Sequence, residues 1–462
     1  MVPPKLLVAA GLLTLSLVAA VPAAAVTPGE DEGPPSTREP AREPGDSSSG
    51  ANEHAVLRTS GGEVVLMPTA RLQVDAAFFP RQTPKSGAYL RRARVGLAGW
   101  LSHLFYFDVA IDMTPLPPEG AGSVAPSALA TADAFVAFAP PGDRFIVQAG
   151  QFDAPFTLEN RTSDAYTPFI ERSMAVRTLG VPRNKEVGVM AHGLVAGMFY
   201  YSAGLFNGEG PGYRNLDNQP DAIGRLVLAP FGARSASIGG SAWYGRHVLG
   251  AAFPVQATAG GLQFINPRWS NTADLEMREQ GRVMAFAGEL SVPIGNRFGL
   301  RAEGVFKKQD LSEVDVSAGP GGPIEPRGDA SLQGIAGYGE AWVWLVGDGR
   351  LLPVPGLQLP VRPERRSRFE DRPFDPGLMF VLRGELLKED VTSNLPTLGN
   401  PNRATTRVVS GSLGLNYWRG RLVRFSLNYT GNYWSGTSET IKTLAVDGVL
   451  EHEVLLRFAL SL

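Results

Sequence analysis

Basic side chains gather in one stretch of the chain where they could bind a small anion. Guanidinium groups donate paired hydrogen bonds to phosphate and carboxylate oxygens, and an ammonium group adds a point charge. The basic residues of this stretch are Arg161, Arg172, Arg177, Arg183 and Lys185. Acidic residues are interspersed among them, namely Asp153, Glu159, Asp164 and Glu171. Ion pairs within the loop are the commoner use of such mixed charge, so both interpretations stay open.

Other kinds of chemistry find little support in the residues. The chain has no Cys, and its five His are scattered without metal-ligand spacing to one another. No nucleophile elbow, phosphate-cradling loop or zinc signature is present. We therefore expect no enzyme, no cofactor and no metal site, although a hydrolase assembled from separate strands stays an alternative. The net charge of -2 gives no basic footprint for nucleic acid.

The elements that must position these residues are predicted to be strands. Apolar and polar residues alternate with a period of two, which puts them on opposite faces of a strand. The clearest case sets Val423, Phe425, Leu427 and Tyr429 against Arg424, Ser426, Asn428 and Thr430. One face suits lipid and the other suits water, so the pattern predicts an all-β, transmembrane antiparallel barrel over residues 61–462. A soluble β-protein is the alternative.

Sixteen such strands can be placed, an even number, as is usual in bacterial outer-membrane barrels. They are predicted to begin near Val65, Ala88, His103, Thr131, Arg144, Lys185, Ala196, Asp221, Ser235, Gln280, Arg297, Gln333, Pro376, Thr405, Arg421 and Gly448. Short turns alternate with long loops between them, as expected of periplasmic turns and outer loops. Residues 347–375 break this rhythm, being long where a short turn is expected. This segment is either a long excursion or a sign of miscounted strands.

Aromatic residues near the predicted strand ends would suit the girdles that sit at the two membrane interfaces. They are Trp100, Phe105, Trp342, Trp344, Tyr417, Trp418, Tyr433 and Trp434.

The N-terminus predicts export. Lys5 precedes an apolar run from Leu6 to Val21, and Ala23-Ala24-Ala25 forms a small-residue cleavage site. Residues 1–25 are therefore predicted to be a signal peptide, with an uncleaved anchor as the alternative. Residues 26–60 are rich in Pro, Glu, Ser and Gly and predict a disordered leader. This leader would act as a spacer or attach the protein to the cell wall.

Two motifs resemble the phosphate-selective porins of the porin O/P family. Residues 150–159 read Gly-Gln-Phe-Asp-Ala-Pro-Phe-Thr-Leu-Glu, and residues 168–173 read Pro-Phe-Ile-Glu-Arg-Ser. Residues 90–97 and 105–108 are also similar to the family, and the resemblance is closest over the first half of the mature chain. It implies a trimeric, sixteen-stranded outer-membrane porin whose third outer loop folds into the pore.

The resemblance implies that the loop over residues 152–184 narrows the pore. The candidate constriction and anion-binding residues are then Arg92, Arg94, Arg161, Arg172, Arg177, Arg183 and Lys185. We expect passive diffusion of small polar solutes, with anions such as phosphate as a hypothesis. The expected partners are outer-membrane lipid, these solutes and two further copies of the chain. The alternative is a blocked barrel that serves as a surface receptor or adhesion scaffold.

The wall of the predicted lumen carries mixed charge. Arg225, Arg301, Arg383, Arg424 and Arg457 face the same side as acidic residues. Those acidic residues are Asp108, Asp112, Glu289, Glu303, Glu340 and Glu385. The sequence therefore lacks the dense basic ladder of a dedicated phosphate channel, which leaves the solute undecided.

Overall fold

A computed structural model describes most of the chain from residue 56 onward. The described residues are 56–59, 61–80, 86–114, 130–212, 215, 217–248, 256–257, 263–265, 275–315, 325–349, 352, 354–360, 376–394, 403–436 and 449–462. The predicted signal peptide lies outside them, as does the predicted leader apart from residues 56–59. Among the described residues, no helix is long and apolar enough to span a membrane.

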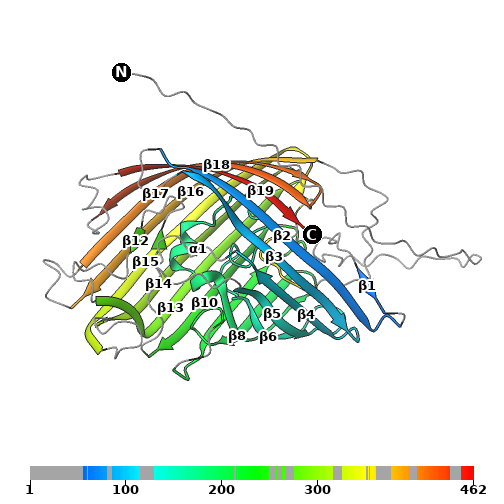
Figure 1. The fold of residues 1–462 in the computed structure, drawn as a ribbon, viewed down its shortest axis with the longest axis horizontal. Coiled ribbons are helices and arrows are strands. Elements are labelled where there is room, and N and C mark those ends of the chain that lie inside the picture. The colour runs from blue at the N-terminus through cyan, green and yellow to red at the C-terminus, as the bar shows by residue number, and fades with distance from the viewer. Residues whose placement is uncertain are drawn as a thin grey trace, which may run out of the picture. The chain divides into compact units, whose positions relative to one another are not determined.

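Sixteen strands of the described residues close into one antiparallel barrel (Figure 1). The first nine are β2 (Val64–Phe78), β3 (Gly87–Leu101), β4 (Phe105–Asp112), β5 (Ala130–Phe138), β6 (Ile146–Asp153), β7 (Lys185–Val195), β8 (Phe199–Phe206), β9 (Asp221–Leu228) and β10 (Ser237–His247). The other seven are β13 (Leu275–Ile294), β14 (Phe298–Asp315), β15 (Glu325–Val346), β16 (Pro376–Ser393), β17 (Arg403–Arg419), β18 (Val423–Gly436) and β19 (Val449–Ser461). This confirms the predicted fold class.

The ring closes where the last strand meets the first. β19 pairs with β2, so that Ser461 lies opposite Arg71 and Val454 opposite Phe78. Closure satisfies the backbone of every barrel strand and leaves no edge in the lipid. Three short strands stand outside the ring: β1 (Leu57–Arg58) pairs with β2, while β11 (Gln256–Ala257) and β12 (Gln263–Ile265) pair with each other.

The alternation sorts side chains as a membrane barrel requires. On β18, Phe425 and Leu427 are 50% and 43% exposed on the outside, whereas Ser426 and Asn428 are each 3% exposed inside. Apolar residues thus face lipid and polar residues face the lumen, the reverse of a soluble protein.

The aromatic residues expected at the membrane interfaces divide between the two faces. Phe105, Tyr417 and Tyr433 are exposed on the outside, as predicted. Trp100, Trp344, Trp418 and Trp434 are instead buried on the inside, so their predicted girdle role is wrong. The physical reason is the two-residue period, because neighbours such as Tyr417 and Trp418 must point to opposite faces.

Fourteen predicted strand starts lie within three residues of the observed ones, and two do not. β13 begins at Leu275 rather than near Gln280, and β15 begins at Glu325 rather than near Gln333. Their outer ends pair with β14 through largely polar sequence, which in β15 includes Pro326 and Gly328. A register irregularity between Glu279 and Val283 explains the offset in the β13 pattern.

Residues 347–375 do not reflect a miscount. β15 and β16 pair directly, with Ala330 opposite Ser393, so the segment is one long connection between adjacent strands. It leaves the barrel at the end that carries the short turns and the C-terminus, called here the short-turn end. The other end, the long-loop end, carries the long connections such as residues 207–220.

The connection between β6 and β7 folds into the barrel. This lumenal loop, residues 154–184, contains α1 (Met174–Leu179) and the short helix η1 (Pro182–Asn184). α1 packs against the inner faces of β14, β15 and β16 (Figure 1). Buried side chains of the loop, among them Phe156 and Leu179, join wall residues such as Val305 in one apolar cluster. The lumen is therefore partly filled by its own chain.

Candidate functional site

Carboxylates of the barrel wall hold the backbone of the lumenal loop. Glu303 on β14 accepts hydrogen bonds from the N–H groups of Leu158 and Glu159, at 2.8 and 2.9 Å. Glu385 on β16 accepts one from Met174 N–H at 2.6 Å, at the start of α1. These three hydrogen bonds fix the loop to one side of the barrel.

Arginines of the wall hold the carbonyl groups of the same loop. Arg424 on β18 donates to the oxygens of Thr167 at 2.7 Å and Ala165 at 3.1 Å. Arg457 on β19 donates to the oxygen of Ile170 at 3.1 Å. The loop is thus attached along β14, β16, β18 and β19.

Glu159 organises the middle of the loop. Its carboxylate accepts from the N–H and hydroxyl of Ser173, at 2.8 and 2.6 Å, and pairs with Arg383 of β16 at 3.1 Å. Ser173 is also the N-cap of α1, where its side chain accepts from Val176 N–H. Serine is favoured at this position because it satisfies an N–H group that the helix leaves free. One buried carboxylate therefore fixes both the helix start and its contact with the wall.

Asp164 is the point at which the loop crosses to the opposite wall. Its carboxylate forms ion pairs with Arg71 of β2 and with Arg92 of β3 at 2.8 Å, and Arg94 lies 3.8 Å away. Arg94 also pairs with Asp112 of β4 at 2.7 Å. Burial raises the pKa of the Asp164 carboxyl, but the three arginines and Arg172 outweigh it and hold that pKa well below its ordinary value. Asp164 is therefore charged at neutral pH.

A second segment enters the lumen from the short-turn end. This lumenal strap, residues 354–360, lies within the long connection between β15 and β16. Gly356 donates its N–H to Thr162 Oγ1 at 2.9 Å and accepts from Arg225 at 2.7 Å. Gln358 donates to Asp153 at 2.8 Å. The strap thus contacts both the lumenal loop and the last residue of β6.

Glycine is required at the strap's contact point. Gly356 has a φ of +69°, which side chains rarely adopt. A Cβ there would lie 2.7 Å from a buried nitrogen of Arg225. That arginine is itself fixed by Glu289, with two bonds of 2.7 and 2.8 Å, so it cannot easily move aside.

A cavity of about 400 Å³ runs between the wall β2 to β6, the lumenal loop and the strap. It extends toward the C-terminus, since Leu462 is among its lining residues. Seven basic side chains line it: Arg71, Arg92, Arg94, Arg161, Arg172, Lys185 and Arg421. Four carboxylates accompany them: Asp108, Asp133, Asp153 and Asp164. The cavity therefore carries an excess of positive charge.

Five of the seven predicted site residues line this cavity, namely Arg92, Arg94, Arg161, Arg172 and Lys185. Arg177 lies on α1 and is not among the lining residues, and the side chain of Arg183 lies outside the described part of the chain.

The lining residues of the loop have structural partners. Arg172 donates to the carbonyl oxygens of Glu159 and Thr162, and Arg161 to that of Asp153. Lys185 contacts both Asp133 and Asp153, at 2.6 and 2.7 Å. These contacts agree with the alternative that mixed charge holds the loop together.

Sequence reasoning missed Arg71 and the strap. Arg71 occupies the inward face of β2, which the alternation already indicated. The signal for the strap was that residues 347–375 form a long connection where a short turn is expected.

The comparisons with known proteins agree with this architecture. The family described as phosphate-selective porin O and P matches residues 69–311. In-vitro folded OmpT of Vibrio cholerae superposes with a TM-score of 0.52 at 10% identity, over 88% of this chain and 99% of that chain. Its trimer form gives a TM-score of 0.50 at 11% identity, over 86% and 99%.

An anion-selective porin from Comamonas acidovorans gives a TM-score of 0.46 at 10% identity, over 87% of this chain and 100% of that chain. No protein with a curated description matches the sequence. The likeness to OmpT supports the barrel fold alone.

Proposed function

This chain belongs to the phosphate-selective porin O and P family, and from that membership we propose that it passes small polar solutes by diffusion, preferring anions such as phosphate, rather than catalysing a reaction. The protein is a channel of the bacterial outer membrane. The proposed path follows the cavity along β2 to β6, narrowed by the lumenal loop and the strap. Outer-membrane lipid would surround the barrel.

The observation that carries the anion preference is the charge of the cavity lining. Basic side chains outnumber carboxylates there by seven to four. Positive side chains replace part of the hydration of a passing anion, and the neighbouring carboxylates keep binding weak enough for release. Net positive charge also repels cations from the same narrow space.

Arg92 and Arg94 are the proposed central contacts, because they meet the lumenal loop at Asp164. A phosphate or carboxylate oxygen would accept from these guanidinium groups in exchange with Asp164. Arg161, Arg172 and Lys185 would extend the path along the loop. We keep Arg177 and Arg183 as candidates at the end of the loop that leads to β7.

Planar-bilayer recording of the purified protein tests this proposal. In a tenfold KCl gradient, the reversal potential should have the same sign as the equilibrium potential of chloride. Inorganic phosphate should reduce the chloride current. A reversal potential that favours potassium would contradict the anion preference. Purified protein that forms no channels but hydrolyses lipid or ester would favour an enzyme instead.

A blocked barrel remains a second candidate, favoured by the two segments that occupy the lumen. Both the lumenal loop and the strap are fixed by buried hydrogen bonds, as at Glu303 and Arg225. A receptor or adhesion scaffold of this kind would give no steady current in the same bilayers. Current that appears only after removal of residues 352–360 would support this candidate.

We also propose that three copies assemble. Five strands, β4, β5, β6, β8 and β9, contain only eight or nine residues. A tilted strand needs about 9–11 residues to span the bilayer core, so this low wall gains from cover by a neighbouring copy. One OmpT structure is described as a trimer form. A slower gel band in unheated detergent extracts, with a mass of three chains, tests the assembly.

Finally, we propose that residues 1–25 are removed on export and that residues 26–60 precede the barrel as a leader. The mass of the mature protein tests the first point. A mass that retains Met1 would indicate an uncleaved anchor instead.

A further inference from the structure

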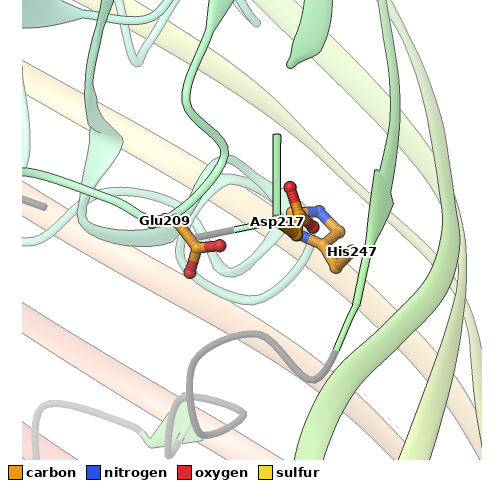
Figure 2. A group of neighbouring side chains, drawn as sticks. All are labelled: Glu209, Asp217 and His247. Carbon is orange, nitrogen blue, oxygen red and sulfur yellow. The ribbon is translucent and has the colours of Figure 1, made fainter. Parts of the chain in front are cut away.

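A buried group of metal-ligating side chains lies at the long-loop end, away from the proposed solute path. Glu209 and Asp217 come from the connection between β8 and β9, and His247 ends β10 (Figure 2). One ligand atom from each residue lies within 4.8 Å of the others. Glu209 and His247 are only 6% and 3% exposed. No two of these three residues stand at metal-ligand spacing in the sequence, so the group could not be predicted from it.

Two further carboxylates approach the same imidazole ring. Asp221 Oδ1 lies 3.6 Å from His247 Nε2, and Glu279 Oε2 lies 3.9 Å from His247 Nδ1. Both distances exceed that of a good hydrogen bond. Within the described residues, His247 Nε2 and Asp221 Oδ1 have no hydrogen-bond partner, although Asp221 is only 1% exposed. These two atoms are therefore buried and face each other at a distance too long for a good hydrogen bond, while the other carboxylate oxygen of Asp221 accepts from Trp243 Nε1 at 2.8 Å.

Among the described residues, the side chains that approach His247 are mostly acidic. Lys307 on β14 interacts with Asp221 and Glu279, and its ammonium also lies 4.7 Å from the centre of the Trp243 ring. Within the described residues, Lys307 can offset only one of the carboxylates of Asp217, Asp221 and Glu279, which gather around His247. Buried carboxylates are normally paired or coordinate a metal, because burial without a partner is costly. A divalent cation would supply the missing charge and the missing partners together.

We propose that Glu209, Asp217 and His247, with Asp221, bind one divalent first-row transition-metal ion, of which Zn²⁺ fits best. Imidazole and carboxylate together suit Zn²⁺, whereas Ca²⁺ and Mg²⁺ prefer sites made of oxygen alone.

Part of the site is already ordered by hydrogen bonds. Asp217 accepts from Val248 N–H at 2.8 Å, which ties the loop to the residue that follows β10. A bound metal ion would strengthen this tie and hold Glu209 and Asp217 at the long-loop end. The inference is independent of the solute that the channel passes.

Zinc binding to the refolded, full-length protein without a polyhistidine tag tests the proposal. After chelator treatment, competition with a chromophoric chelator should reveal one tight Zn²⁺ site per chain. Zn²⁺ should also raise the temperature of the heat-modifiable gel shift of the wild type. Asp217→Asn and His247→Ala should weaken binding at least tenfold, since each removes a ligand. Asp329→Asn, an exposed residue of β15 at the same end, should bind as the wild type does.

Several results would overturn the proposal. Wild-type protein that binds no Zn²⁺ at micromolar concentration excludes the site without any variant. Equal affinity of Asp217→Asn and wild type places the ion elsewhere. Binding of Ca²⁺ in preference to Zn²⁺ and Mn²⁺ refutes the ligand chemistry. If a variant fails to fold, as judged by its gel mobility, the wild-type titration and the Zn²⁺-dependent thermal shift still decide the question.

Discussion

Replacing Asp164 by asparagine should increase the anion preference of the channel. The carboxylate is the negative charge that the lumenal loop sets among Arg71, Arg92 and Arg94. Asparagine keeps the size of the side chain and one acceptor oxygen, but removes the charge. The variant therefore leaves three guanidinium groups with less competition for a passing anion.

The size of the effect follows from the local distances. Asp164 Oδ2 lies 2.8 Å from Arg92 Nε, so an anion bound to the same guanidinium would lie about 5 Å from the carboxylate. Two unit charges repel over this distance by about 0.8 kcal/mol in water and by about 3 kcal/mol at an effective dielectric constant of 20. The lower figure corresponds to about a fourfold change in anion occupancy. The side chain of Asp164 is only 11% exposed, which favours a larger effect.

The assay is the reversal potential of single channels in a KCl gradient, for wild type and Asp164→Asn side by side. The permeability ratio of chloride to potassium should rise about fourfold or more. Asp329→Asn removes an acidic charge at the long-loop end outside the cavity, and it should leave the ratio unchanged. An unchanged ratio in Asp164→Asn, or a shift toward potassium, would refute the idea that solutes pass Arg92.

Three further predictions concern the strap, the closure of the barrel and the pH dependence of the Asp164 ion pairs. Gly356→Ala should displace the strap, because its Cβ meets Arg225, and single-channel conductance should rise; an unchanged conductance would mean that the strap does not narrow the path. Arg457→Met should lower the temperature of the heat-modifiable gel shift, since it leaves the buried carboxylate of Asp75 without its two 2.7 Å bonds at the closure of the barrel, a loss of about 3–5 kcal/mol; a shift at the wild-type temperature would contradict this. Because folding lowers the pKa of Asp164, the stability that its charged form contributes should be complete at neutral pH and should decline only as pH falls below about 4 toward that lowered pKa. In urea unfolding, the difference in free energy of unfolding between wild type and Asp164→Asn should therefore be equal at pH 8 and 6 and should shrink in stronger acid. A difference already lost at pH 6 would argue against the ion pairs of Asp164.

The sequence predicted the barrel because the signal for a two-sided strand is local. At 423–430 each side chain's chemistry alone assigns its face, and the structure follows that assignment at Phe425, Ser426, Leu427 and Asn428. The predicted starts of β13 and β15 were wrong because pairing with β14 extends both strands through largely polar sequence. The predicted interface position of Trp418 was wrong because the alternation places this aromatic side chain on the inner face.

The sequence predicted which basic residues belong to the candidate site, but not which groups they bind. The resemblance pointed to the loop after β6, and five of the named basic residues do line the cavity. Their partners could not be deduced, because a guanidinium binds whichever carboxylate or carbonyl the fold brings near. Arg92 meets Asp164, and Arg424 meets Thr167, across long stretches of sequence.

By itself, then, the sequence determined which residues face lipid and which face water, since strand periodicity is set by neighbours along the chain. Only the tertiary structure decided what fills the lumen. In the folded chain, the lumenal loop packs against strands β14 to β19 and the strap contacts Thr162. Glu209, Asp217 and His247 also lie close together only in the folded chain. Each of these contacts joins segments that are distant in sequence, and their energies depend on geometry and burial that exist only once the ring has closed.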